Sequence, residues 1–189
     1  MKTNAKLTTK KIVLTALMAA LTVVGSSLRI KVPLEITGTT AFHLGNIMCA
    51  LSGILLGPWL GGLASGLGSL LYDIMDPAYI SECWITFLMK GAYGLVAGLI
   101  DYGGHKEWGY VKALIGTIAG AVTYAALYLL KSYFYSGLFL KGLTHEAALA
   151  TVIGKLPATI FNAAVAIVAA PLLAVAIRKA LEKSHISLN

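Results

Sequence analysis

Residues 42–75 read FHLGNIMCALSGILLGPWLGGLASGLGSLLYDIM, and they indicate the fold class of the chain. Its first part, from about Phe42 to Leu56, and its second part, from about Leu60 to Met75, are almost wholly apolar. The residues between them, Gly57 to Trp59, contain a Gly-Pro pair, which is a turn signal. Two apolar segments joined by a short turn predict two consecutive membrane helices.

The composition of the whole chain favours the same class. Of its 189 residues, 58% are hydrophobic and 12% are charged, whereas about a quarter of a soluble domain is charged. This balance excludes an ordinary soluble domain, a disordered chain and a nucleic-acid-binding tail protein. Because one span takes about 20 residues, we expect one all-α domain over residues 1–189, an integral membrane bundle of six transmembrane helices. The expected helices are Lys11–Leu28, Phe42–Leu56, Leu60–Met75, Cys83–Ile100, Tyr110–Tyr135 and Ala147–Ile177.

Basic residues orient this bundle. Lys and Arg number 15 and Asp and Glu number 8, so the net charge is +7. With six spans, the N-terminal segment, the loop after the fourth span and the C-terminal tail carry most of the lysines and arginines and fall on one side. Loops rich in Lys and Arg are usually cytoplasmic, so we expect both termini in the cytoplasm and a multi-pass location in the cell membrane. Residues 12–25 are interpreted as a retained helix rather than a signal peptide.

Small residues four positions apart indicate how the helices pack. The pairs are Gly53/Gly57, Gly57/Gly61, Gly62/Gly66, Gly94/Gly98 and Gly116/Gly120. Such residues share one helix face, where glycine lets two backbones approach closely. Packing within the chain is the simpler interpretation of these glycines. The first helix has Ala16 and Ala20 on one face instead, and this face either packs internally or docks a partner helix.

Polar groups inside the expected spans gather in the outer half of the membrane. Those nearest the outer ends of the second, third and fourth helices are His43, Asn46, Asp73, Trp84 and Lys90. The inner half is nearly pure Ala, Leu, Ile, Val and Gly. A channel usually has polar groups along its whole path, so this asymmetry predicts a pocket open to the outside instead of a route through the protein.

Two helix faces supply further candidates for binding a solute. Lys155, Thr159 and Asn162 follow one another at helical spacing on the sixth helix, with Lys155 roughly 12 Å deep. Tyr124 and Tyr128 form an i,i+4 pair on the fifth helix. Together with the tryptophan of the fourth helix, the two tyrosines are suited to sandwich a flat ring.

Each of these residues also has a purely structural interpretation. Asp73 either serves the site or pairs with Lys90 or Lys155 to hold helices together. Asn162 is equally suited to an interhelical hydrogen bond. His43 has no HxxxH pattern and no carboxylate partner in sequence, so we predict no metal and no cofactor. The chain has no GxSxG, Walker A or HExxH motif, and we therefore expect no enzymatic activity.

Four segments together resemble a known family. They are TTKKIVLTALMAALTVV near the N-terminus, residues 42–74, ITFLMKGAYGLVAGLI in the fourth helix and GKLPATIFNAAVA in the last helix. The chain resembles the substrate-binding S component of energy-coupling factor (ECF) vitamin transporters, closest to the branch of riboflavin- and pyridoxine/hydroxymethylpyrimidine-type components. LGPWLGGLASGLGSLLYD and TFLMKGAYGLVAG are the most specific parts.

The resemblance implies a function and a set of partners. An S component binds one vitamin near the extracellular face, and the loop at about Lys31 to Ala41 is then a lid. Its AxxxA motif, here Ala16 and Ala20, docks a transmembrane coupling subunit that joins two cytoplasmic ATPase subunits. The resemblance implies binding regions that match Lys90, Tyr128, Lys155, Thr159 and Asn162 of this chain. The aromatic pattern described above adds Trp84 and Tyr124 to the expected substrate-binding site.

We therefore expect a vitamin-binding S component of an ECF-type importer. Its ligand is expected to resemble pyridoxine or hydroxymethylpyrimidine first and riboflavin second. Two alternatives stay open at this point. One is a self-sufficient secondary transporter, for which inverted repeats and broken helices are the usual signs. The other is a structural membrane subunit whose polar cluster only holds helices together.

Overall fold

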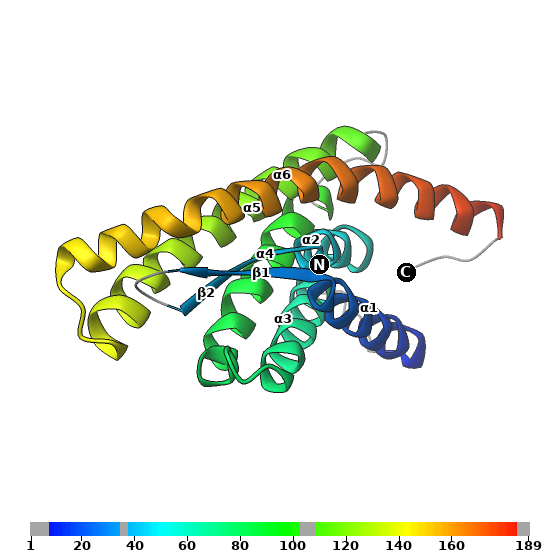
Figure 1. Cartoon of the computed structure of the whole chain (residues 1–189). Coiled ribbons are helices and arrows are strands. Elements are labelled where there is room, and N and C mark those ends of the chain that lie inside the picture. The colour runs from blue at the N-terminus through cyan, green and yellow to red at the C-terminus, as the bar shows by residue number, and fades with distance from the viewer. Residues whose placement is uncertain (1–7, 35–37, 103–108, 185–189) are drawn as a thin grey trace, which may run out of the picture.

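Six helical regions and one β-hairpin make up the part of the chain that the structure describes, a computed structural model covering residues 8–34, 38–102 and 109–184. The start of α1 and the end of α6 lie toward the same side of the bundle, at the right in Figure 1. In chain order the elements are α1 (Thr9–Ser27), β1 (Arg29–Leu34), β2 (Gly38–His43), α2 (Gly45–Leu56), α3 (Pro58–Met75), the 3₁₀ turn η1 (Ile80–Glu82), α4 (Cys83–Tyr102), α5 (Gly109–Leu130), the π-helix η3 (Lys131–Leu140) and α6 (His145–Lys183).

The helices confirm the predicted all-α architecture, to which the structure adds one β-hairpin. Four described segments are long and apolar enough to cross a membrane, namely Thr9–Ser27, Ile80–Tyr102, Gly109–Leu140 and His145–Lys183. α2 is apolar but has only 12 residues, fewer than the roughly 20 of a typical span. The chain is thus an α-helical membrane protein, while six crossings and cytoplasmic termini stay predictions.

The turn between α2 and α3 forms where the sequence predicts it. Gly57 has a φ of +81°, a conformation that favours glycine, and Pro58 occupies the first turn of α3. The backbone N–H of Gly57 donates to the carbonyl of Gly53 and so ends α2. This turn brings α2 and α3 side by side without a loop.

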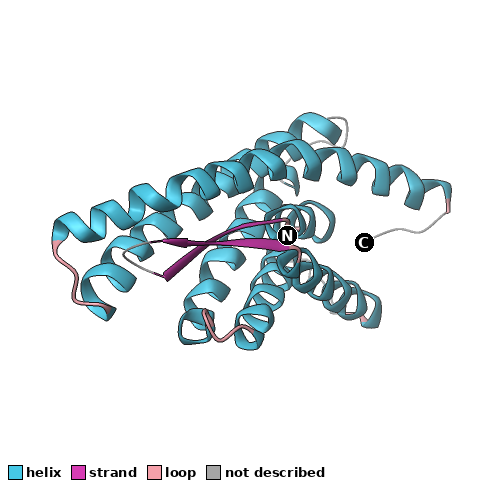
Figure 2. Cartoon of the chain, viewed as in Figure 1, coloured by secondary structure: helices cyan, strands magenta, loops and turns pink. Residues whose placement is uncertain are grey.

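The first loop departs from the prediction, because a β-hairpin replaces the start of the expected second helix (Figure 2). Phe42 and His43 were expected in that helix, but they end β2, and α2 begins only at Gly45. β1 and β2 pair antiparallel with Arg29 opposite His43 and Leu34 opposite Gly38. Pairing with β1 and the hydrogen bonds to Asn162 of α6 hold the residues before Gly45 in an extended conformation. Residues 35–37 of the expected lid lie outside the described residues.

The segment after α5 is the second departure. A loop was expected near Ser136–Glu146, but the chain stays helical as η3 up to Leu140. π-helices are rare, and π-helical turns are frequently found at functional sites. Their wider turn changes which side chains share a face, so the helical periodicity used to assign α5 does not predict the direction of the side chains in η3.

Close backbone contacts hold α2, α3 and α4 together. A Cβ added at Gly53 would lie 2.1 Å from the carbonyl oxygen of Gly94 on α4, and one added at Gly61 would lie 2.4 Å from the Cα of Gly53. A Cβ at Gly116 of α5 would lie 2.6 Å from the carbonyl oxygen of Ala97. These glycines therefore pack helices within the chain, as the simpler interpretation of their spacing predicts.

A second polar cluster joins the far ends of three helices. Arg178 of α6 forms an ion pair with Asp101, near the C-terminal end of α4, and donates to the carbonyl oxygen of Ile54 in α2 at 2.8 Å. The sequence placed Arg178 in a tail and Asp101 in a loop, whereas both lie in helices that are longer than expected. The pair ties α2, α4 and α6 together at the end of α4 away from Glu82.

Candidate functional site

A cavity of about 360 Å³ lies at the end of the bundle where β2, η1, η3 and the first half of α6 meet. Its volume is in the lower part of the range of small-molecule sites. Every helix contributes to its wall except α2, as do both strands of the hairpin. The lining residues on which the following paragraphs depend are Arg29, Thr39, Thr40, Ala41, His43, Asp73, Tyr79, Glu82, Lys90, Tyr124, Tyr128, Lys131, Ser132, Ser136, Lys155, Thr159 and Asn162.

Two stacked tyrosines form an aromatic wall of the cavity. The rings of Tyr124 and Tyr128 are 5.8 Å apart between centroids and inclined by 21°. Behind them, the ring of Tyr93 stacks on Tyr124 at 6.0 Å and is wholly buried. Their one-turn spacing on α5 explains the parallel rings, since residues four apart share a helix face. We call Tyr124 and Tyr128 the tyrosine wall.

A lysine lies over each ring of the tyrosine wall. The ammonium nitrogen of Lys90 is 3.9 Å from the ring centroid of Tyr124, and that of Lys155 is 5.3 Å from the centroid of Tyr128. Both distances are within the range of a cation–π contact. The two lysines are 4% and 6% exposed, so both positive charges are buried in the cavity wall.

Both buried lysines have neutral hydrogen-bond partners. Lys90 donates to the side-chain oxygen of Asn46, and Lys155 donates to the hydroxyl of Ser132 at 3.1 Å. The sequence left open whether Asp73 pairs with one of them. The ion pairs found among the described residues join other groups, although Asp73 lines the same cavity as Lys90.

Asn162 binds the hairpin. Its side-chain oxygen accepts from the backbone N–H of His43 at 2.9 Å, and its side-chain nitrogen donates to the carbonyl oxygen of Ala41 at 2.8 Å. The amide thus continues the hydrogen bonding of β2 onto α6. Thr159, one turn away, donates its hydroxyl to the carbonyl oxygen of Lys155 at 2.9 Å. Both residues line the cavity, but these groups already have protein partners.

His43 is held as a neutral ring. Burial lowers the pKa of His43 well below its ordinary value of 6.5, and the nearby charges of Lys90 and Arg29 lower it further. Its Nδ1 accepts from the backbone N–H of Gly45 at 3.1 Å. This bond links the end of β2 to the first residue of α2, so His43 orients the hairpin on the bundle.

Trp84 is the one predicted site residue that the structure places outside the cavity lining. Its side chain is 50% exposed and meets Tyr135 edge-on, with ring centroids 5.8 Å apart. The remaining six predicted residues come together around the cavity: Lys90, Tyr124, Tyr128, Lys155, Thr159 and Asn162.

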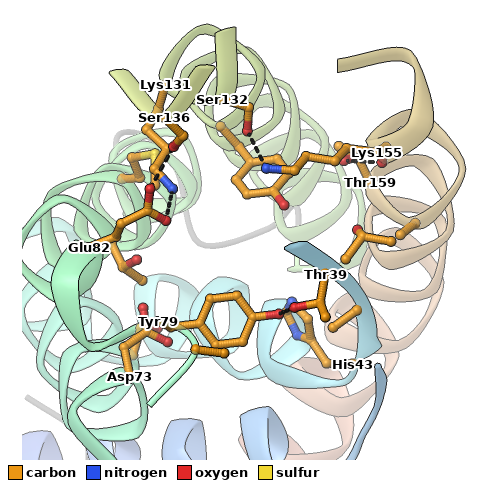
Figure 3. A pocket seen from close by; sticks show the side chains of 18 of the residues that line it. Thr39, His43, Asp73, Tyr79, Glu82, Lys131, Ser132, Ser136, Lys155 and Thr159 are labelled. Atoms are coloured by element: carbon orange, nitrogen blue, oxygen red, sulfur yellow. Dashed lines mark hydrogen bonds and ion pairs between the residues drawn. The ribbon is translucent and has the colours of Figure 1, made fainter. Parts of the chain in front are cut away.

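Several lining residues were missed by the sequence analysis. Arg29 lies 3.8 Å from the ring centroid of Tyr72 and 5.3 Å from that of Tyr79. The hydroxyl of Tyr79 is 3.0 Å from that of Thr39, so the residue bridges to the hairpin across one side of the cavity (Figure 3). Tyr79 lies between two predicted spans, where the sequence had no periodicity by which to assign it to a site.

An ion pair between an exposed lysine and a buried aspartate connects the hairpin to the loop after α3. The ammonium nitrogen of Lys31 is 2.6 Å from a carboxylate oxygen of Asp76. The hydrogen bond with Asp76 raises the pKa of Lys31 from its usual value. Burial raises the pKa of Asp76, but hydrogen bonds from Lys31, the Ala78 N–H and Tyr72 outweigh burial and leave it below the usual value. Both shifts favour the charged pair.

Replacing Asp76 by asparagine is therefore expected to speed ligand release several-fold, because the hairpin loses its charged link. In the wild-type protein, the contribution of the raised Lys31 pKa is lost only as the pH rises past it. The contribution of the lowered Asp76 pKa is lost only as the pH falls through it. Release should thus be insensitive to this pair from about pH 5 to about pH 9. Stopped-flow release measurements check both statements, and equal rates in the variant would refute the link.

The predicted docking residues lie on the outside of the bundle. Ala16 and Ala20 are both exposed on α1, as are the larger apolar residues around them. Those exposed neighbours are Ile12, Val13, Leu17, Leu21 and Val24. Because small residues let a second helix approach closely, this face is open to a partner helix.

Comparison with known proteins gives one family and two relatives. A family model described as ECF-type riboflavin transporter, S component, matches residues 6–179. A protein of Pyrococcus woesei, described as an uncharacterized protein in the gap 3′ region, is 31% identical over 118 residues, which are 62% of this chain and 74% of that protein. A UPF0397 protein of Streptococcus gordonii is 34% identical over 93 residues, which are 49% of this chain and 47% of that protein. The family match includes every residue of the cavity wall.

Proposed function

Because this chain belongs to the ECF-type riboflavin transporter S component family, we propose that it captures a small, ring-containing, water-soluble vitamin at the extracellular side of the cell membrane. The role of the family is to bind the substrate of a transporter, not to catalyse a reaction. The proposed ligand resembles pyridoxine or hydroxymethylpyrimidine first and riboflavin second. Both chemistries offer a flat ring with hydrogen-bonding groups.

The observation that supports this proposal is the tyrosine wall with its two lysines in one cavity. A flat heterocycle packed on Tyr128 or Tyr124 gains an offset stacking contact. Lys90 and Lys155 then meet polar groups on the rim of the ring, because each ammonium lies over one ring of the wall. We propose that Lys90, Tyr124, Tyr128 and Lys155 contact the ligand. Thr159 and Asn162 line the cavity beside them.

Calorimetric titration of the purified chain in lipid nanodiscs tests the proposal. Riboflavin, pyridoxine and hydroxymethylpyrimidine are the probes, and no other subunit is present. We expect saturable binding of at least one of them with one site per chain. Absence of binding for all three would contradict capture of a vitamin of these types by the isolated component.

We propose further that transport depends on partners. The chain is expected to associate through α1 with a transmembrane coupling subunit, which in turn contacts two cytoplasmic ATPases. The exposed small residues of α1 support this assignment. ATP hydrolysis would then drive release of the vitamin inside the cell, and the S component itself needs no nucleotide site.

Replacing Ala16 or Ala20 by tryptophan is expected to abolish co-purification with the coupling subunit while vitamin affinity stays within about twofold. The indole fills the groove that a partner helix would enter, whereas the cavity is built by other elements. Ala126→Trp is the matched control, since Ala126 is exposed on α5, away from this face. Loss of assembly in the control as well, or loss of vitamin binding in the α1 variants, would contradict the assignment.

A further inference from the structure

The π-helix η3 and the facing part of α6 concentrate positive charge at one end of the cavity. Lys131, Ser132 and Ser136 of η3 line the cavity there, and Lys155 reaches toward them from α6. Figure 3 shows Lys155 meeting Ser132 on one side and Lys131 meeting Glu82 on the other. We call Lys131, Ser132, Ser136 and Lys155 the basic end of the cavity.

Glu82 is the carboxylate that the described residues place at this end, and it is already paired. Glu82 forms an ion pair with Lys131 and accepts from the hydroxyl of Ser136 at 2.6 Å. Lys155 interacts electrostatically with both members of that pair, so it adds a second cation to a pair that is already neutral. The charge of Lys155 therefore has no counter-ion of its own within the described part of the chain.

Burial makes this excess charge costly. Lys155 is 6% exposed, and it donates a hydrogen bond to the neutral hydroxyl of Ser132. An ammonium group has three donors, and a buried cation is normally paired with an anion. The cavity as a whole shows the same imbalance, since its described lining includes five basic residues but only two acidic ones, Asp73 and Glu82.

The other buried lysine does not share this imbalance to the same degree. Lys90 meets the side-chain oxygen of Asn46 and also interacts electrostatically with Asp73. Asp73 forms none of the ion pairs found among the described residues and lines the same cavity. An anion that enters the cavity would therefore be stabilised most next to Lys155.

We infer that the ligand carries an acidic group, a carboxylate or a phosphate monoester, and that this group binds to the cavity side of the Lys155 ammonium while the ring lies on the tyrosine wall. The inference rests on the proposed vitamin-binding function and specifies its ligand chemistry. Lys155 supplies a charged donor, because its ammonium has donors beyond the one that the buried hydroxyl of Ser132 accepts. Tyr128 connects the two subsites, because Lys155 lies 5.3 Å from its ring centroid.

Matched ligands that differ only in the acidic group test this inference. The probes are pyridoxine, 4-pyridoxate and pyridoxine 5′-phosphate, together with riboflavin and riboflavin 5′-phosphate. Each is titrated calorimetrically into the purified wild-type chain in nanodiscs at low and high salt. We expect an acidic member to bind at least about tenfold tighter than its neutral parent, since hydrogen bonds to charged groups are the stronger ones. The larger gain, for carboxylate or for phosphate, identifies the acidic group.

Two variants test whether Lys155 causes the preference for the acidic ligand. Lys155→Gln keeps a side chain that can donate a hydrogen bond but removes the charge, and it should abolish the preference for the acidic member. Lys179→Gln removes a charge from the exposed far end of the same helix and should leave the preference unchanged. A preference that survives in Lys155→Gln would overturn the assignment to Lys155.

If a variant fails to fold, the titrations of the wild-type chain still test whether the ligand is acidic. Equal or weaker binding of both acidic classes, alongside measurable binding of a neutral parent, would overturn the inference and leave the proposed function standing. Absence of binding for every probe would overturn both.

Discussion

Replacing Gly53 by alanine is expected to destabilise the bundle by about 3 kcal/mol, near the upper end of the usual cost of overpacking. The added Cβ would lie 2.1 Å from the carbonyl oxygen of Gly94 and 2.9 Å from the backbone nitrogen of Gly98. Both are backbone atoms of α4, so no side chain can rotate away, and the two helices must separate. Because α3 packs on the same place through Gly61, the displacement spreads to a third helix.

The thermal unfolding midpoint in one fixed detergent measures this effect. Gly91→Ala on α4 is the matched control, since the nearest atom to its added Cβ is the carbonyl oxygen of Gly62 at 3.5 Å, an ordinary contact. Alanine also favours a helix more than glycine does. A midpoint for Gly53→Ala equal to that of Gly91→Ala would show that the helices do not approach as closely as described.

Replacing Lys155 by alanine is expected to weaken binding of the ligand by well over tenfold. The variant removes a buried charged donor and leaves the hydroxyl of Ser132 and any ligand group opposite it without a partner. The cation–π contact with Tyr128 is lost at the same time. Titration calorimetry with the tightest ligand of the wild-type protein measures the loss.

The control for this variant is Lys179→Ala, which removes an exposed lysine from the same helix outside the cavity. Its affinity should equal that of the wild-type chain. Unfolding midpoints of both variants show whether the helix is intact. An unchanged affinity in a folded Lys155→Ala protein would remove Lys155 from the site.

Much of the fold could be predicted because apolar runs and turn residues act locally. The break at Gly57 is one such case, since its positive φ and the following proline set the turn without help from distant residues. The close approach of α2 and α4 also follows from a local pattern, the spacing of Gly53, Gly94 and Gly98. The site residues on regular helices, such as Tyr124 and Tyr128, were placed on one face for the same reason.

What could not be predicted depends on contacts between distant segments. The hairpin is paired along its whole described length and is anchored by Asn162, which is 119 residues away from His43 in the chain. The π-helix η3 does not repeat every 3.6 residues, which is the period by which the side chains of α5 were assigned to a face. Ser132 and Ser136 were therefore not predicted to line the cavity. Trp84 was assigned to the site by its place near the outer end of α4, but the helix turns its ring away from the cavity toward Tyr135.

Two polar clusters lie at opposite ends of the bundle. The cavity lies at one end of the bundle, while the Arg178–Asp101 pair and its contact with Ile54 close the other end. Between them α2, α3, α4 and α5 make close backbone contacts at glycines. Such a molecule has room to bind a solute, and we propose that its movement across the membrane relies on the partner subunits.

Native mass spectrometry of the purified chain, expressed in cells grown with vitamins, tests whether the chain captures an acidic, ring-containing vitamin. We expect one small molecule retained per chain, with the ultraviolet absorbance of an aromatic ring and an acidic group in its fragmentation spectrum. The molecule should be lost from Lys155→Ala and kept by Lys179→Ala. A chain that carries no small molecule, and gains none after incubation with the vitamin probes, would contradict the account.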